Sequence, residues 1–164
     1  MNRLGIFVDG RTIKARFHVA HRISGAPYGL DRLHGHTYEM RVSLEGKGQA
    51  DFLYPFEALM EIMTECAQAL DNKVLLADGG DNVAKFDNGV ITYVGADEKR
   101  YMFPKDDVMF LPVKEVTAEA LANYLLNEIC EKLRKSDVST SEISGVELTL
   151  WEGYERGVVV RGTL

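Results

Sequence analysis

The sequence predicts an α+β fold, in which a four-stranded antiparallel sheet carries two helices on one face. Segments that alternate apolar and polar residues occur towards both ends of the chain. Two segments between them repeat apolar residues at helical spacing. Strands grouped in pairs, with helices between the pairs, are typical of a sheet covered on one side. The 164 residues fit a single domain, 1–164, with enough length for a hydrophobic core.

The N-terminal part predicts three strands and a loop. Strands over 4–9 and 11–21 are predicted to form a hairpin around an Asp-Gly pair. Glycines and a proline interrupt the pattern over 22–32, which indicates a loop. A long strand is predicted over 33–46. Its apolar side chains share one face, and they are Tyr38, Met40, Val42 and Leu44.

Two amphipathic helices are predicted. The first spans about 54–70, with Pro55 in its first turn, where a missing N–H costs nothing. The second opens at Thr117, a good N-cap, and ends near Lys135. Their apolar stripes are Phe56, Leu59, Met60, Met63, Ala67 and Leu70 in the first helix, and Leu121, Leu125, Ile129 and Leu133 in the second. Both helices contain one cysteine, Cys66 and Cys130, which we interpret as small buried hydrophobes.

The remaining segments predict further strands. Two final strands are expected over about 145–151 and 156–163, where apolar and polar residues alternate. The link 73–113 contains an Asp-Asn-Gly turn between two β-rich runs, followed by a second turn, which predicts a small three-stranded insert over about 83–103. We interpret this insert as a surface elaboration or a subunit contact, with a lid over the site as the alternative.

All the histidines of the chain lie within 17–39, and they are His18, His21, His34 and His36. Side chains alternate along a strand, so His34 and His36 point to the same face, whereas His18 and His21 point to opposite faces. At most one of His18 and His21 can therefore share a site with His34 and His36. Three imidazoles on strands, with a fourth position open to water or substrate, are typical of a catalytic zinc site. Iron, nickel and copper also accept such ligands.

Two motifs carry a resemblance to a known family. Phe17–Arg22 reads FHVAHR and Leu33–Glu39 reads LHGHTYE, and together they resemble the paired zinc motif of the 6-pyruvoyltetrahydropterin synthase family. That family includes 6-carboxytetrahydropterin synthase. Shorter matches to the family follow in the same order along nearly the whole chain. They are weak individually, and they are Asp51-Phe52, Leu70-Asp71, Thr117-Ala118-Glu119 and Trp151-Glu152.

The resemblance implies a site and an assembly. Its zinc ligands would be His21, His34 and His36, and Zn²⁺ would be the cofactor. Glu152 would anchor the pterin, since a carboxylate can accept two parallel hydrogen bonds from the ring. Thr117 would also contact substrate. The family's tunnelling fold joins the sheets of several subunits into a barrel, which implies a homo-oligomer, a trimer or a hexamer, with active sites between subunits.

The chain departs from the family pattern at two positions. The family's catalytic cysteine stands four residues before the HGH motif, where this chain has Leu30. The histidine that forms the family's Asp–His pair is replaced by Asn72, next to Asp71. Some members carry a glutamate three residues before HGH and resemble aldolases; this chain has Asp31 there. We take Asp31 and Asp71 as the candidate catalytic residues.

Three functions are consistent with these features. The first is a zinc-dependent carbon–oxygen or carbon–carbon lyase that acts on 7,8-dihydroneopterin triphosphate or a close relative. The second is a retro-aldol enzyme that forms 6-hydroxymethyl-7,8-dihydropterin with Asp31 as the base, because this chemistry requires no thiolate. The third is a catalytically inactive protein that binds zinc and a pterin, because two of the family's proton-transfer residues are missing.

Composition limits the partners and the location. The formal net charge is -6, which argues against nucleic acid and anionic membranes as general partners. No apolar run reaches the roughly 18 residues of a membrane span. The N-terminal apolar run is too short for a signal peptide, so we expect the protein in the cytoplasm.

Overall fold

The computed structural model describes residues 4–13, 15–48 and 51–164. Lys14, inside the strand predicted over 11–21, lies outside the described residues. The elements in chain order are β1 (Gly5–Asp9), β2 (Arg16–His21), β3 (His34–Gly46), α1 (Phe56–Leu70), β4 (Lys73–Ala77), β5 (Val83–Asp87), β6 (Val90–Val94), β7 (Arg100–Pro104), the 3-10 helix η1 (Lys105–Asp107), β8 (Val108–Leu111), α2 (Ala118–Lys135), β9 (Ile143–Glu152) and β10 (Arg156–Gly162).

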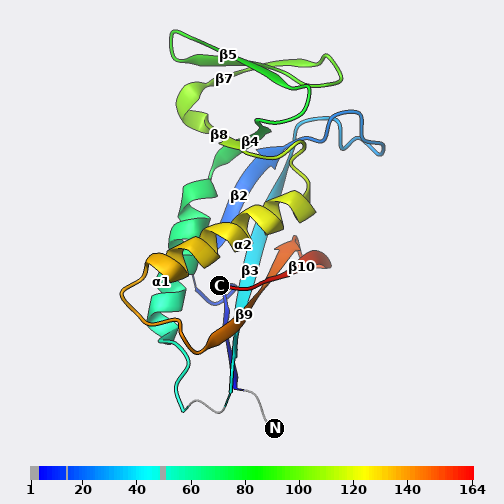
Figure 1. Cartoon of the computed structure of the whole chain (residues 1–164). Helices are drawn as coiled ribbons and strands as arrows, with labels where there is room; N and C mark the ends of the chain where they lie inside the picture. The colour runs from blue at the N-terminus through cyan, green and yellow to red at the C-terminus, as the bar shows by residue number, and fades with distance from the viewer. Residues whose placement is uncertain (1–3, 14, 49–50) are drawn as a thin grey trace.

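The body of the molecule is a large sheet organised around β3 (Figure 1). Over the described residues this sheet has seven strands in the order β10-β9-β3-β2-β4-β8, with β1 also paired to β3. On one side β3 pairs antiparallel with β9 along most of its length. On the other side it pairs with β2 and then, further along, with β1. The predicted α+β class is confirmed.

The predicted hairpin between 4–9 and 11–21 is wrong. Over the described residues, β1 and β2 both pair with β3, one after the other, instead of pairing with each other. Gly10 explains this path, because its N–H donates to the Met40 carbonyl oxygen at 2.8 Å. A Cβ at Gly10 would overlap with that oxygen and crowd Ala15, so only glycine fits. The chain bends out after β1 and returns to the same edge of β3.

Two strands that the pattern did not predict extend the sheet beyond β2. β4 pairs parallel with β2, and β8 pairs parallel with β4. Both are short, apolar runs without alternation, which is typical of parallel strands buried on both faces. The four predicted strand regions therefore form only part of the sheet. The chain leaves β4 to form the insert and returns through β8.

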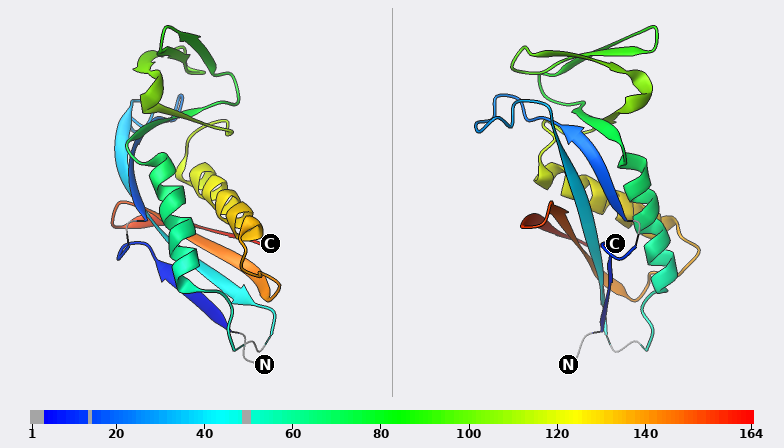
Figure 2. Two further views of the ribbon diagram at one scale, coloured as in Figure 1. Left: turned by 90° about the vertical axis from the view of Figure 1, so that its left-hand side faces the viewer. Right: turned by 180° about the vertical axis from the view of Figure 1, so that it is seen from behind.

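The predicted insert is confirmed as a separate three-stranded antiparallel sheet of β5, β6 and β7. Its first turn uses Asn88 and Gly89, both with positive φ. Figures 1 and 2 show the insert beyond one end of the large sheet, close to the loop 22–32. That position brings the insert near the histidines, which lie at the same end of β2 and β3.

Helices α1 and α2 cover the same face of the large sheet (Figure 2). Thr117 caps α2 as predicted, since its side chain accepts a hydrogen bond from Ala120 N. Pro55 is the N-cap of α1 rather than part of its first turn, and Phe56 is largely exposed rather than part of the buried stripe. Both cysteines are free and buried, as predicted. In the described chain, no helix combines the length and the apolar character needed to cross a membrane.

Candidate metal centre and active site

Three histidines converge where β2 ends and β3 begins. His21 lies directly opposite His34 in the antiparallel ladder, and His36 follows on the same face of β3. One ring nitrogen from each residue lies within 4.8 Å of the other two. His18 lies on the opposite face of β2 and is exposed. The structure therefore brings together the three histidines that the family resemblance implies as ligands.

Backbone carbonyls orient two of the imidazoles. His21 Nδ1 lies 2.7 Å from the carbonyl oxygen of Val116, and His34 Nδ1 lies 2.7 Å from that of Arg32. A carbonyl can only accept, so each Nδ1 carries the proton and each Nε2 keeps its lone pair. Both Nε2 atoms are buried and have no hydrogen-bond partner. Two unpaired buried acceptors, held in place through their opposite ring nitrogens, fit a metal ion.

Burial favours the neutral form of two of these histidines, His21 and His36. Loss of hydration lowers the pKa of His21, and the neighbouring His34 and His36 act in the same direction. Burial also lowers the pKa of His36, although Glu152 acts against it. Neutral imidazole is the ligand form, so both shifts favour metal binding near neutral pH.

Glu152 completes the group from the end of β9. It pairs with Tyr38 across the ladder, and its Oε1 accepts a hydrogen bond from the buried Tyr38 hydroxyl at 2.8 Å. The same oxygen lies 3.4 Å from His36 Nε2. Its Oε2 accepts a hydrogen bond from Arg156 Nε at 2.8 Å. Burial alone would raise the pKa of Glu152, but Tyr38, His36 and Arg156 together hold it below its usual value.

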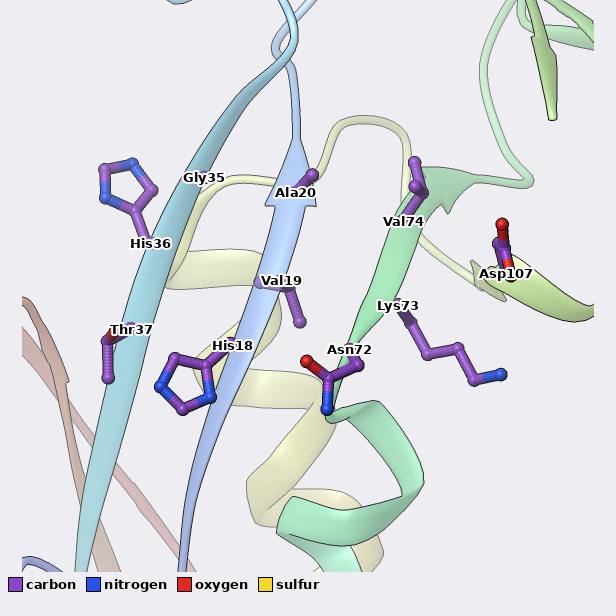
Figure 3. A pocket seen from close by; sticks show the side chains of 10 residues that line it. All are labelled: His18, Val19, Ala20, Gly35, His36, Thr37, Asn72, Lys73, Val74 and Asp107. Carbon is purple, nitrogen blue, oxygen red and sulfur yellow. The ribbon is translucent and has the colours of Figure 1, made fainter.

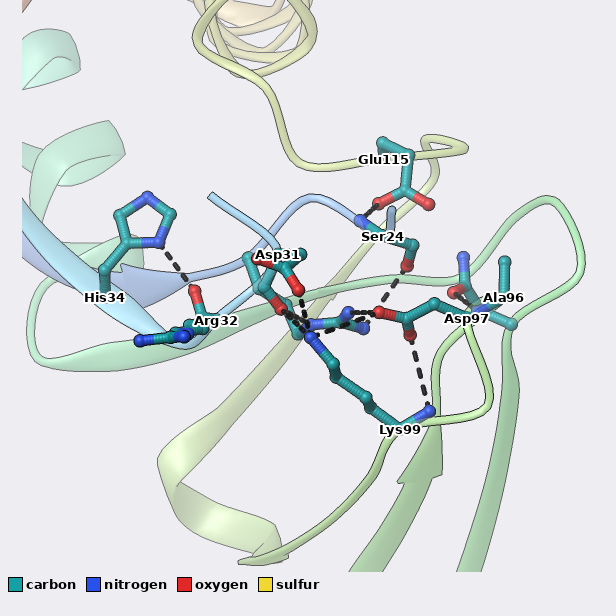
Figure 4. Close-up of polar contacts among 10 residues, drawn as sticks. Ser24, Asp31, Arg32, His34, Ala96, Asp97, Lys99 and Glu115 are labelled. Atoms are coloured by element: carbon teal, nitrogen blue, oxygen red, sulfur yellow. Dashed lines mark hydrogen bonds and ion pairs between the residues drawn. The ribbon is translucent and has the colours of Figure 1, made fainter. Parts of the chain in front are cut away.

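Asp31 lies at the end of the loop 22–32, next to the residue whose carbonyl orients His34 (Figure 4). Its carboxylate forms an ion pair with Lys99, which comes from the turn between β6 and β7 of the insert. The hydrogen bond from Lys99 lowers the pKa of Asp31. Asp31 is therefore a carboxylate at neutral pH, and its position depends on a residue far away in the sequence.

Asp71 has a histidine partner, though not the one that the family pattern places beside it. Its Oδ1 accepts a hydrogen bond from the His18 backbone N–H at 2.8 Å and lies 3.1 Å from His18 Nδ1. Asn72 adopts a positive φ of 58° and donates its N–H to the His18 carbonyl oxygen. Asparagine tolerates this left-handed conformation better than most residues. The structure does not bring Asp71 to the three clustered histidines, because His18 points to the other face of β2.

An open hollow of about 510 Å³ lies on that other face, beside His18. Figure 3 shows His18 and Thr37 on neighbouring strands, with Asn72 just before β4 and Lys73 at its start, across the hollow. His36 contributes to its rim. The two faces of the β2–β3 ladder thus carry different polar groups, with the histidine cluster on one and the His18–Asp71 pair on the other.

Thr117 lies one residue after Val116, whose carbonyl oxygen orients His21. Its side-chain oxygen accepts the hydrogen bond from Ala120 N at 3.1 Å that caps α2. The residue is half-buried. Its hydroxyl proton remains available, because in the cap the oxygen only accepts.

Comparison with known proteins identifies the family. A family model described as 6-pyruvoyl tetrahydropterin synthase matches residues 11–163. The chain belongs to the 6-pyruvoyltetrahydropterin synthase family. A protein of Methanocaldococcus jannaschii, provisionally named a 6-carboxy-5,6,7,8-tetrahydropterin synthase, is 32% identical over 156 residues, 94% of each chain. A protein of Pyrococcus horikoshii with the same provisional name is 27% identical over 122 residues, 74% of this chain and 69% of its own.

Solved structures of the family share the fold. The 6-pyruvoyltetrahydropterin synthase of Plasmodium vivax is 24% identical, with a TM-score of 0.87 and 100% of both chains covered. In two variants of that enzyme, a glutamate described as a catalytic residue is replaced. At this identity the likeness shows the fold alone.

Sequence reasoning missed several residues that shape this family member's site. Tyr38 was expected in the apolar core, yet its hydroxyl binds Glu152. His18 was not among the implied metal ligands, yet it is the partner of Asp71. Lys99, in the turn that precedes β7, forms the ion pair with Asp31. The only sequence signal for His18 was its place in the histidine cluster, and Lys99 had none.

Proposed function

We propose that this family member is a zinc-dependent lyase that acts on 7,8-dihydroneopterin triphosphate or a close relative. The observation that carries this proposal is the pair of buried, unpartnered Nε2 atoms of His21 and His34, with His36 and the Glu152 carboxylate beside them. A candidate metal site and a candidate ring anchor thus lie side by side, which suits a substrate that has a flat heterocycle and a hydroxylated side chain.

His21, His34 and His36 would hold the zinc ion, with one coordination position open to substrate. When bound, the ion lowers the pKa of a coordinated hydroxyl and stabilises the negative charge that develops on it. The chain orients the ligands through the carbonyl oxygens of Val116 and Arg32. These bonds fix the tautomer of two imidazoles before any ligand arrives.

Glu152 would hold the pterin ring. Each carboxylate oxygen offers two lone-pair positions, and Tyr38 and Arg156 each occupy one. One position on each oxygen therefore remains for the ring's amino group and its adjacent N–H. The lowered pKa keeps Glu152 ionised, which strengthens both bonds. Thr117 would contact substrate from the start of α2.

Asp31 would accept the hydroxyl proton. Leu30, at the family's cysteine position, cannot transfer a proton. Asp31 is ionised at neutral pH because Lys99 lowers its pKa. In retro-aldol cleavage, Asp31 would take the proton of the hydroxyl whose carbon becomes the aldehyde, the adjacent carbon–carbon bond would break, and the same carboxyl group would return the proton to the carbon that stays attached to the ring. The products would be 6-hydroxymethyl-7,8-dihydropterin and a two-carbon aldehyde. The presence of Asp31 and the leucine at the family's cysteine position favour this reaction over elimination.

Asp71 would act only indirectly, through His18 or in a neighbouring copy of the chain. The protein would be a homo-oligomer, a trimer or a hexamer, since β10 presents an edge of the large sheet to which another strand can pair. We place it in the cytoplasm. Light scattering of the purified protein would give the oligomeric state directly.

Product identification tests the proposal. The zinc-loaded protein would be incubated with 7,8-dihydroneopterin and with its triphosphate, and the products identified by mass spectrometry. A 6-hydroxymethyl product would establish the retro-aldol reaction, and a carboxy- or pyruvoyl-tetrahydropterin would establish elimination. Bound but unchanged substrate would instead identify an inactive pterin-binding protein.

A His34→Ala variant is the matched control. Loss of the metal and of turnover together is the expected result. Turnover that survives complete loss of the metal would refute a zinc-dependent lyase.

A further inference from the structure

A buried arginine joins the insert to the loop beside the histidines. Arg22 directly follows His21, and its side chain is only 3% exposed. Its Nη2 forms an ion pair with Asp97, in the turn between β6 and β7. Its Nε donates to the Asp31 carbonyl oxygen at 2.9 Å. One guanidinium therefore ties the end of the loop 22–32 to the insert.

Lys99 makes a second connection from the same turn. Its Nζ forms an ion pair with the Asp31 carboxylate and lies 3.4 Å from the Asp31 carbonyl oxygen. It also lies 3.7 Å from Asp97 Oδ2. Figure 4 shows Asp31, Lys99 and Asp97 gathered in one group, with His34 nearby. Both the backbone and the carboxylate of Asp31 are therefore held from the insert.

The turn itself is shaped for this contact. A Cβ on Gly95 would overlap with Arg22 Nη1, so only glycine allows the guanidinium to pack against the turn. Asn82 accepts a hydrogen bond from Ala96 N at 3.1 Å and donates to the Lys114 carbonyl oxygen at 3.1 Å. The insert is thereby anchored to the segment that leads into α2.

The same segment holds the other end of the loop. Glu115 Oε2 accepts a hydrogen bond from Ser24 N at 2.9 Å. The next residue, Val116, orients His21. The loop is thus held at its start by Glu115 and at its end by the insert. A surface elaboration with no role at the site would not require these contacts with the loop.

We propose that the insert is a positioning device for the candidate base, and that Lys99 and Asp97 are positioning residues that fix the Asp31 carboxylate at the end of the loop, three positions before His34. This inference rests on the proposed function only in calling Asp31 the base. The sequence interpretation of the insert as a surface elaboration or a subunit contact left out this role. Lys99 binds Oδ2 of Asp31, and in this proposal Oδ1 is the oxygen that would accept the substrate proton.

Substitution of Lys99 tests the catalytic part of this role. Lys99→Met should lower kcat about 10- to 100-fold, because small displacements of a catalytic group are costly. Lys99→Arg keeps the charge and should restore most of the rate. Lys85→Met, on the exposed face of β5 in the same insert, is the matched control and should behave as wild type.

The pH profile separates positioning from a general loss of structure. The cations that face Asp31 are Lys99 and Arg32, while Arg22 binds its carbonyl oxygen and Asp97 lies behind Lys99. Loss of Lys99 should raise the pKa of Asp31, so the acid limb of kcat/KM should move to higher pH. Wild-type kcat and an unchanged acid limb in Lys99→Met would overturn the proposal.

A measurement without substrate distinguishes failure of this inference from failure of the proposed function. Hydrogen exchange of the Ile23, Leu30 and Arg32 amides, which are bonded within the loop, should accelerate at least tenfold in Asp97→Asn. Carbon NMR titration of the Asp31 carboxyl should show its pKa rise in Lys99→Met. If the wild type lacks turnover but both changes occur, only the assigned function fails. If neither change occurs, the positioning role is refuted whatever the activity.

Discussion

The hydroxyl of Tyr38 donates a hydrogen bond to Oε1 of Glu152 at 2.8 Å across the ladder of β3 and β9. Tyr38 lies two residues after His36 on the same face of β3, so one strand carries both a candidate metal ligand and the support for the candidate ring anchor. Because Tyr38 is fully buried, the bond holds Glu152 in one orientation beside the histidines. The spacing between the histidine cluster and Glu152 is thereby set by a strand rather than by a loop.

Tyr38→Phe should weaken both the fold and the binding of a pterin. It removes a hydrogen bond to a carboxylate, which contributes about 1.5–3 kcal/mol to the free energy of unfolding. Urea unfolding of the metal-free protein would measure the loss. Tyr154→Phe, at a fully exposed tyrosine, is the control and should leave stability unchanged. Equal stability of Tyr38→Phe and wild type would show that the bond contributes nothing.

Metal content should depend on His21 and not on His18. The two residues lie on opposite faces of β2, and only His21 joins the cluster. We expect native mass spectrometry to find one zinc ion per chain in wild type and in His18→Ala, but none in His21→Ala. Free zinc at 100 times its Kd should raise the free energy of unfolding of wild type and of His18→Ala by about 2.7 kcal/mol. Equal zinc binding by His21→Ala would exclude this cluster as the metal site.

Asp31→Asn should abolish most turnover while it preserves the metal site. A general base contributes roughly 10²- to 10⁴-fold to a rate, and an amide cannot accept the proton. Steady-state kinetics with zinc-saturated protein would measure kcat, and zinc content would be checked in parallel. Asp87→Asn, at the exposed end of β5, should retain the wild-type rate. A normal kcat in Asp31→Asn would remove Asp31 as the base.

Asp71→Asn should lower stability in a pH-dependent way. The His18 backbone N–H is the largest cause of the lowered pKa of Asp71, and the His18 ring also lowers it, while burial acts in the opposite direction. Because the pKa of Asp71 in the folded protein lies below that of an unfolded aspartate, the stabilisation is fully present above the unfolded pKa and is lost as the pH falls through the folded pKa.

Urea unfolding over a range of pH would test this. At pH 7 the variant should be less stable by about 0.5–1.5 kcal/mol, the usual net contribution of a hydrogen bond. The difference should persist down to about pH 4 and shrink below the ordinary pKa of aspartate. Asp81→Asn, at an exposed loop position, provides the control. A difference that grows with falling pH would contradict the assignment.

Local patterns predicted most elements because their causes are local. Helical spacing predicted α1 and α2, and Thr117 predicted the start of α2 because an N-cap acts within one turn. The Asn88-Gly89 pair predicted the hairpin of β5 and β6 for the same reason. Alternation along β3 placed His34 and His36 on the face of Tyr38. The paired histidine motifs were enough to point to the family.

Pairings between distant segments required the tertiary structure. The Asp-Gly pair after β1 has the composition of a hairpin turn, yet close packing of Gly10 against Met40 sends β2 along β3 instead. β4 and β8 are short runs without clear alternation of apolar and polar residues, so periodicity alone does not reveal them. Only their parallel pairing with β2 and with each other shows them to be strands of the large sheet.

The sequence by itself determined which side chains are available for chemistry, because histidine spacing on a strand fixes their faces. Only the tertiary structure decided their partners. Lys99 reaches Asp31 across 68 positions of the chain, and His18 meets Asp71 across 53. Such contacts depend on how whole elements pack, and no local pattern records that packing. Asp31 was a candidate base from the sequence, but its contact with Lys99 and the unpaired Nε2 atoms of His21 and His34 became visible only in the folded chain.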